Sequence, residues 1–205
     1  MLTLNEKFLL LALKGEKGSI PAGYISYGLA GALLMDLIFL KRIDIVKKKV
    51  IILDTTKTDD DLLNEALSVL SQSRKEKTAE YWITKLASKI KSLWKRVADT
   101  LLDKGIVQKQ QIKILGLFPA TRYPVLAAET KDSLISDLKT AVFSEEQPDD
   151  DMVALICLSS ACNILRPFFE SDERREVSKR AKKMLKEHPV GRAVAAAIAA
   201  IISSS

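Results

Sequence analysis

The stretch GYISYGLAGALLMDLIFLKR, residues 23–42, decides how the chain folds. It carries a single charge, Asp36, before Lys41 and Arg42 close it. About 20 apolar residues suffice for a helix to span a bilayer, and one acid near the end of the helix does not prevent spanning. The rest of the chain, however, is amphipathic, and the flanks supply neither a second span nor a belt of aromatic residues. We therefore interpret this stretch as a helix buried among other helices.

Three glycines, Gly23, Gly28 and Gly31, lie in the same apolar stretch. A helix surrounded by amphipathic helices is expected to be apolar on every side. Glycine has no side chain, so these positions allow neighbouring helices to approach closely. The C-terminal segment AVAAAIAAII, residues 193–202, is too short to span a bilayer and is interpreted in the same way.

The composition describes one globular domain over residues 1–205. Of the 205 residues, 47% are hydrophobic and 28% are charged, which is enough apolar material for a full core. The net charge is +6, but residues 74–122 contain 12 basic and four acidic residues, so the excess is concentrated there. A basic segment suggests a polyanionic partner such as phospholipid headgroups, nucleic acid or a phosphorylated ligand. The alternative is a solvated charged face.

Few residues could carry catalysis or bind a metal. Cys157 and Cys162 are five positions apart on one expected helix, so their side chains should point apart and form no disulfide. His188 is the only histidine, and we expect it in a surface turn without a partner. The acids at 149–151 precede an apolar run and are expected to cap a helix. We predict no catalytic residue, no metal site and no cofactor, and therefore no enzyme.

The pattern of apolar residues predicts a mainly α fold with two short β-hairpins. Thr3 and Glu6 form a capping box for a first helix that ends before Gly15, and Pro21 can begin the buried helix. The remaining expected elements are a hairpin at 43–53, helices at 59–71 and 78–104, a hairpin at 113–126, and helices at 132–143, 149–165, 172–186 and 190–202.

The expected helix at 78–104 presents a core stripe and, beside it, a basic edge. On one continuous helix, Trp94 would lie at the border of the stripe, with Lys91 and Lys95 farther round on the same side. An indole at such a border can pack its body and turn its N–H outward, so Lys91, Trp94 and Lys95 are candidates for binding an anionic lipid headgroup. The alternative is a border tryptophan covered by lysine stems. The stripe consists of Ile83, Leu86, Ile90, Leu93, Val97 and Leu101.

The second hairpin, KILGLFPATRYPVL, places apolar residues at its turn. If Leu115, Leu117 and Phe118 are exposed, they can insert into a lipid interface, where each large side chain contributes about 1.5–3 kcal/mol. Nearby lysines would add about 1 kcal/mol each at an anionic surface. The alternative is that these residues pack on the helices.

Several stretches, in order along the chain, resemble the Golgi phosphoprotein 3 family of phosphatidylinositol 4-phosphate effectors. They are LTLNEKFLLLALKGEKG, ISYGLAGALLMDL, RVADTLLDKGIV, LGLFPATRYPVL, ALICLSSACNIL and AVAAAIAAI. The resemblance implies a single domain with a central apolar helix bundle ringed by amphipathic helices and a protruding apolar hairpin. It also implies peripheral membrane binding and recognition of the cytosolic tails of membrane proteins.

The residues that bind the phosphate in the family are mostly replaced in this sequence. The family's tryptophan falls at Pro21, its first arginine at Ala30, and its other two arginines at Lys91 and Trp94. Lys91 alone keeps a positive charge. The resemblance therefore implies an anionic lipid without specifying phosphatidylinositol 4-phosphate.

Two functions are compatible with these patterns. The leading hypothesis is a peripheral membrane adaptor on the cytosolic face, since the N-terminus has its acid before its basic residues and does not resemble a signal peptide. The alternative is a nucleic-acid binder, because a helix followed by a hairpin also describes a winged helix. The apolar turn LGLFP favours the membrane, since a wing usually carries arginine or lysine, and homo-oligomerisation is left open.

Overall fold

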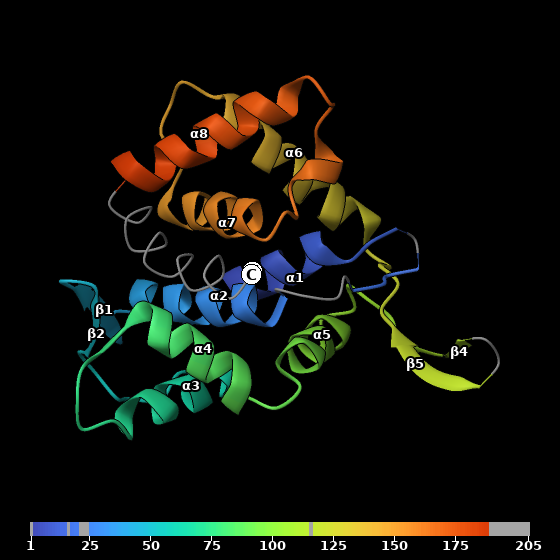
Figure 1. Ribbon diagram of the computed structural model, residues 1–205. Coiled ribbons are helices and arrows are strands. Elements are labelled where there is room, and N and C mark those ends of the chain that lie inside the picture. The colour runs from blue at the N-terminus through green and yellow to red at the C-terminus, as the bar shows by residue number, and fades with distance from the viewer. Residues whose placement is uncertain (1, 16, 21–24, 115–116, 189–205) are drawn as a thin grey trace.

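The computed structural model describes residues 2–15, 17–20, 25–114 and 117–188 (Figure 1). The helices are α1 (Leu4–Ala12), α2 (Ile25–Phe39), α3 (Asp61–Ser71), α4 (Ala79–Lys89), α5 (Leu93–Asp103), α6 (Ala128–Phe143), α7 (Asp150–Ala161) and α8 (Glu173–Glu187), with a 3₁₀ turn at Arg166–Phe168. The strands are β1 (Ile43–Val46), β2 (Lys49–Ile52), β3 (Lys77–Thr78), β4 (Gln110–Ile114) and β5 (Phe118–Arg122). The predicted mainly α fold with two short hairpins is confirmed.

Helix α2 is the centre of the molecule, as the opening stretch predicted. It contacts α1, α3, α4, α5 and α7, and Leu29, Leu33 and Leu37 are fully buried. Figure 1 shows α2 beside α1 in the middle layer, with α6, α7 and α8 on one side and α3 and α4 on the other. No helix among the described residues is long and apolar enough to cross a bilayer. The expected start of this helix at Pro21 and the expected helix at 190–202 fall outside the described residues.

Two glycines in α2 allow the close approach that the sequence predicted. A Cβ atom at Gly28 would lie 2.2 Å from Cζ of Phe8, and one at Gly31 would lie 3.0 Å from Cδ2 of Leu158. Helix α1 therefore packs onto α2 at Gly28, and α7 packs onto it at Gly31. Any larger residue at Gly28 would push against a buried aromatic ring.

Asp36, the single charge of the buried helix, has a structural role that the sequence did not reveal. Its carboxyl group accepts hydrogen bonds from the backbone N–H of Leu4 at 3.1 Å and of Asn5 at 3.3 Å, and from Nδ2 of Asn5 at 3.0 Å. These donors lie in the first turn of α1, where backbone N–H groups otherwise lack partners. Burial raises the pKa of Asp36 to about 7, against the lowering effect of these hydrogen bonds.

The same turn of α1 uses the predicted capping residues. The backbone N–H of Thr3 donates to Oε2 of Glu6 at 3.0 Å, and Nζ of Lys104 lies 2.7 Å from the same oxygen. Nζ of Lys7 pairs with Asp151 at 2.5 Å. The start of α1 is thereby connected to α2, α5 and α7 through polar side chains.

The predicted continuous helix at 78–104 is wrong. The chain forms α4 and α5 instead, and the connection turns at Ile90 (ψ 100°) and Ser92 (φ 53°). The core stripe is confirmed, because Ile83, Leu86, Val97 and their partners in the stripe are all buried. Helix α4 contacts α2 and α3, whereas α5 contacts α1 and α2, and one straight helix could not follow both sets of partners. Packing therefore overrides a helical pattern that has no local stop signal.

Both predicted hairpins are confirmed, and their sheets are small. Strands β1 and β2 are antiparallel, with Val46 opposite Lys49, and β3 extends this sheet on the β2 side. Strands β4 and β5 form a separate two-stranded sheet with Ile114 opposite Phe118. The short third strand β3 was not predicted. Figure 1 shows the two sheets at opposite ends of the helical body.

The other residues singled out in the sequence lie in or beside the layer formed by α6, α7 and α8. Oδ1 of Asp149 accepts from the backbone N–H of Met152 at 2.7 Å, which confirms the predicted cap. Cys157 and Cys162 are both free. The surface turn predicted for His188 is wrong, because His188 is 9% exposed and its Nε2 lies 3.6 Å from Oδ1 of Asp150. The end of α8 packs against the start of α7, a contact between residues distant in sequence.

Candidate membrane-binding surface

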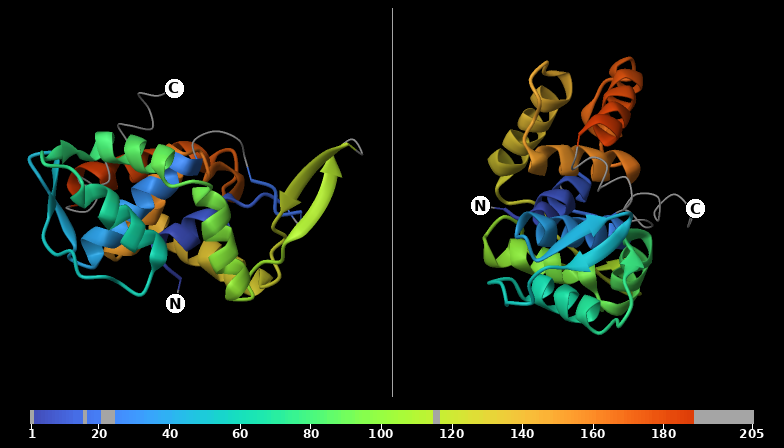
Figure 2. Two further views of the ribbon diagram at one scale, coloured as in Figure 1. Left: turned by 90° about the horizontal axis from the view of Figure 1, so that it is seen from below. Right: turned by 90° about the vertical axis from the view of Figure 1, so that its left-hand side faces the viewer.

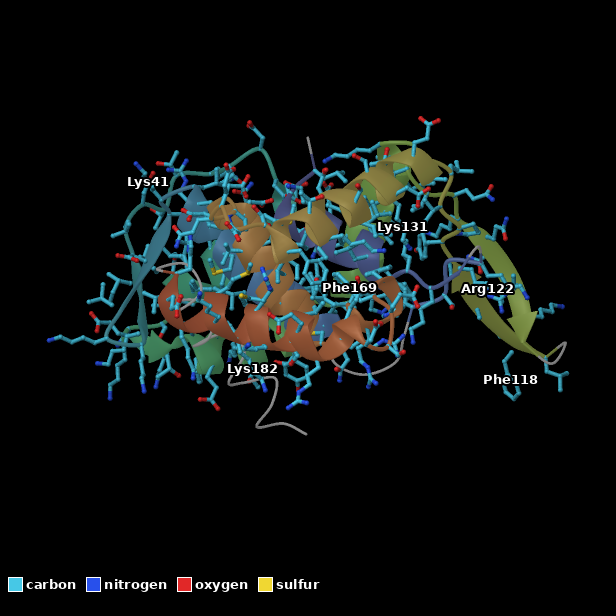
Figure 3. All side chains as sticks on the ribbon, turned by 90° about the horizontal axis from the view of Figure 1, so that it is seen from above. Lys41, Phe118, Arg122, Lys131, Phe169 and Lys182 are labelled. Atoms are coloured by element: carbon cyan, nitrogen blue, oxygen red, sulfur yellow. The ribbon has the colours of Figure 1, made fainter. Side chains whose placement is uncertain are left out.

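The β4–β5 hairpin, residues 110–122, projects from the body and is called the finger below. At its tip, Leu117 is 78% exposed and Phe118 is 62% exposed. Figure 3 shows Phe118 pointing away from the helices, while Arg122 lies nearer the base of the finger. Leu115, the third residue predicted to insert into a membrane, lies outside the described residues. The finger therefore presents at least two large apolar side chains to the surroundings.

The base of the finger is held by contacts on two sides. Tyr123, which follows β5, is 1% exposed, and its ring meets the ring of Trp94 edge-on at 6.0 Å between centroids. Its backbone N–H donates to the carbonyl oxygen of Gly18 at 3.1 Å, and a Cβ atom at Gly18 would lie 1.8 Å from the carbonyl oxygen of Tyr123. Val107 and Val125 form a further antiparallel bridge below the strands. The exposed tip is thus carried by an anchored base.

Polar contacts from Asp99 of α5 and from Lys109 fix the same tyrosine. The hydroxyl of Tyr123 lies 3.4 Å from Oδ1 of Asp99, and Nζ of Lys109 lies 3.0 Å from that oxygen and 5.9 Å from the tyrosine ring centroid. Burial, followed by the charge of Asp99, raises the pKa of Tyr123, and the hydrogen bond to Asp99 raises the pKa of Lys109. Sequence reasoning missed this cluster, since nothing local indicates that residues 99, 109 and 123 meet.

Of the three residues predicted to bind a headgroup, Trp94 and Lys95 lie in the first turn of α5, and Lys91 precedes the helix. Trp94 is half-buried, and Nζ of Lys95 lies 5.5 Å from the centroid of its ring. Lys91 is exposed in the connection between α4 and α5, so the three residues do not share one helix. Trp94 therefore packs against Tyr123 and is covered by Lys95. This arrangement agrees with the alternative interpretation, in which a tryptophan at the core border is covered by a lysine side chain. Their role in lipid binding stays a prediction.

The first turn of α5 is electropositive. Ser92 precedes the helix with φ 53° and makes no side-chain capping hydrogen bond, and the first turn contains no acidic residue. Arg96 pairs with Glu65, while Lys95 is exposed. Backbone N–H groups and the helix dipole at such a terminus favour an anion.

The finger and this helix start face the same side of the molecule. In the left view of Figure 2, the tip of the finger and the connection between α4 and α5 both lie toward the upper edge. Figure 3 shows Phe118 toward its lower edge, which is the same side of the molecule. An apolar tip and exposed lysines are thus available to one flat partner.

The positions that bind phosphate in the resembling family do not form a charged cluster among the described residues. Ala30 is fully buried in α2, and Trp94 contacts Tyr123. Lys91 is the one exposed cation at these positions, and Pro21 lies outside the described residues.

Fold and surface together define a helical domain with an anchored apolar finger beside basic residues. The family model described as Golgi phosphoprotein 3 (GPP34) matches residues 4–201, and the chain belongs to this family. The family comprises Golgi-associated, adaptor-type proteins. The predicted family is therefore confirmed.

The chain is similar to a curated protein of Schizosaccharomyces pombe, Vacuolar protein sorting-associated protein 74. The two are 27% identical over 223 aligned positions, which cover 90% of this chain and 66% of the relative. The chain thus spans slightly less than two thirds of that relative's length.

Proposed function

We propose that this protein is a peripheral membrane adaptor that binds anionic phospholipid headgroups, such as phosphoinositides, on the cytosolic face of a membrane. In this proposal the finger inserts Leu117 and Phe118, together with Leu115, into the lipid interface. Lys91, Trp94 and Lys95 meet the headgroups. Retention or sorting of membrane proteins through their cytosolic tails would follow from the adaptor role of the family.

The exposed tip of the finger is the observation that carries the proposal. A pair of large apolar side chains in water is unfavourable unless a partner covers them at least part of the time. The tip lies on an anchored hairpin, so insertion would not require the finger to rearrange. A duplex-binding wing would instead need basic residues at the tip, which argues against the nucleic-acid alternative.

Electrostatics would complement the apolar contribution. One inserted finger gives reversible binding only, and each lysine near an anionic surface adds about 1 kcal/mol. The start of α5 has no side-chain cap, so the positive end of its helix dipole would also attract negative headgroups. The proposal therefore requires both an apolar interface and negative headgroups.

The test is co-sedimentation with phosphatidylcholine vesicles, with and without phosphatidylserine or phosphatidylinositol 4-phosphate, at low and high salt. We expect binding to the anionic vesicles only, weakened by salt. The double variant Lys91→Gln/Lys95→Gln should bind roughly 30-fold more weakly, at about 1 kcal/mol per charge. The control Lys41→Gln/Lys57→Gln removes the same charge from exposed lysines of other segments, of which Figure 3 shows Lys41 at the edge opposite Phe118, and it should bind as the native protein does. Failure of the native protein to bind any anionic vesicle at low salt would refute the proposal.

A further inference from the structure

The three-stranded sheet, at the opposite end of the molecule from the finger, carries a second concentration of positive charge. Its basic residues come from two places, the turn between β1 and β2 and the segment that leads into β3. We call these residues the sheet-end surface. They are Lys47, Lys48, Arg74, Lys75 and Lys77.

The fold, and not the sequence order, brings these two segments together. Val50 pairs with Lys77 across the β2–β3 ladder, and the backbone N–H of Ala79 donates to the carbonyl oxygen of Lys48 at 3.3 Å. The ion pair between Lys49 and Glu76, at 3.6 Å, joins the same two segments. Basic residues about 27 positions apart in the chain therefore share one surface.

Most of this charge is not neutralised within the described part of the protein. Lys47, Lys48, Arg74 and Lys75 are exposed and form no ion pair with any described residue. Nζ of Lys77 lies 5.3 Å from the ring centroid of Tyr81, a contact that leaves its charge in place. Across residues 43–53 and 73–81 there are six basic and three acidic residues.

A hollow in this surface is lined by apolar and charged residues. The buried Val50, Leu70 and Trp82 line it together with Arg74, Lys75 and Glu76, and Glu76 is paired with Lys49. Val46, the last residue of β1 before the turn, is 47% exposed. Apolar side chains next to unpaired cations match the boundary between phospholipid headgroups and acyl chains.

The sheet-end surface faces the same side as the finger. In the left view of Figure 2 the β1–β2 turn and the tip of the finger both lie toward the upper edge, with α4 between them. One flat bilayer could touch both ends at once, and a nucleic acid or a small anion would gain nothing from the finger at the far end. This shared orientation selects a membrane as the partner.

We propose that the sheet-end surface is a second membrane contact that binds anionic phospholipids and holds the long axis of the protein parallel to the bilayer. This inference rests on the function proposed above and adds a second attachment point to it. The linked contacts raise the avidity for anionic membranes, because binding at one end brings the other end to the surface.

The first test is acetylation of lysines with a water-soluble reagent, read by mass spectrometry for the native protein alone and with phosphatidylcholine–phosphatidylserine vesicles. We expect the vesicles to protect Lys47, Lys75 and Lys77, and to leave the exposed Lys41 and Lys57 reactive, since Figure 3 shows Lys41 at the edge opposite Phe118. Protection of Lys91 and Lys95 without protection of the sheet-end lysines would overturn the second contact and leave the finger proposal intact. If no lysine is protected, both proposals fail.

The second test is the variant Arg74→Gln/Lys75→Gln/Lys77→Gln in the same vesicle assay. We expect roughly 100-fold weaker binding, from about fivefold for each cation removed at an anionic surface. The control Lys41→Gln/Lys57→Gln/Lys139→Gln lowers the net charge equally at exposed lysines of other segments, of which Figure 3 shows Lys41 at the edge opposite Phe118, and it should bind as the native protein does. Equal losses in the two variants would show that net charge alone acts, and this would overturn the sheet-end contact.

Discussion

Replacement of the two apolar residues at the tip of the finger tests the central physical claim. In the variant Leu117→Ser/Phe118→Ser, side chains that are 78% and 62% exposed in the protein become polar. Full transfer of a leucine or phenylalanine side chain from water to an apolar phase is worth about 1.5–3 kcal/mol. Scaled by these exposed fractions, the pair contributes about 3 kcal/mol to insertion, which is roughly 100-fold in the partition coefficient.

The assay is a vesicle titration at constant salt, with the thermal unfolding midpoint measured in parallel. The midpoint should not change, because both side chains are largely exposed and lie outside the buried core. The matched control is Leu126→Ser, which alters a residue that is 57% exposed at the base of the finger and should bind vesicles normally. Unchanged binding of the double variant would refute insertion of the finger, and an equal loss in the control would show that any exposed leucine matters.

Two further predictions concern stability. Gly28→Ala should lower the free energy of unfolding by about 1–3 kcal/mol, because its Cβ would lie 2.2 Å from Cζ of Phe8. Gly31→Ala should cost less, since the atom at 3.0 Å is the flexible end of Leu158, and equal effects in urea titrations would contradict this reasoning. The carboxyl of Asp36 has its pKa raised from 3.8 to about 7 by burial, so the folded state holds the proton more tightly than the unfolded state. Its stabilising contribution, up to about 4 kcal/mol, is present below pH 4 and is lost as the pH rises through about 7. Asp36→Asn should remove this loss of stability between about pH 4 and pH 7. An unaltered pH dependence in the variant would exclude this role of Asp36.

Much of the fold could be predicted from local patterns. The buried helix was evident because α2 is apolar on every side, and both hairpins were evident from short β-branched runs around turn residues. The predicted helix end at residue 104 agrees with the end of α5 at Asp103; Gly105 follows with φ 69°, and the N–H of Ile106 donates to the carbonyl oxygen of Leu101 at 2.9 Å. These features depend on residues that are close in the sequence.

The errors arose where distant segments meet. Nothing near Ser92 indicates a break, and the turn there exists because α4 and α5 follow different neighbours. The environment of His188 depends on Asp150, and that of Trp94 depends on Tyr123, residues 38 and 29 positions away. The exposure of the tip of the finger was likewise left open by the sequence, because an apolar turn can pack inward or project outward.

The sequence by itself determined the family, the helical class and the apolar and basic segments, since these depend on composition, periodicity and local turn chemistry. The tertiary structure alone decided that the finger projects from an anchored base and that basic residues from two segments meet at the sheet. It also decided that Asp36 accepts hydrogen bonds from the first turn of α1. The physical reason is that exposure, pKa and shared surfaces depend on which distant side chains pack together, and packing is a property of the whole core.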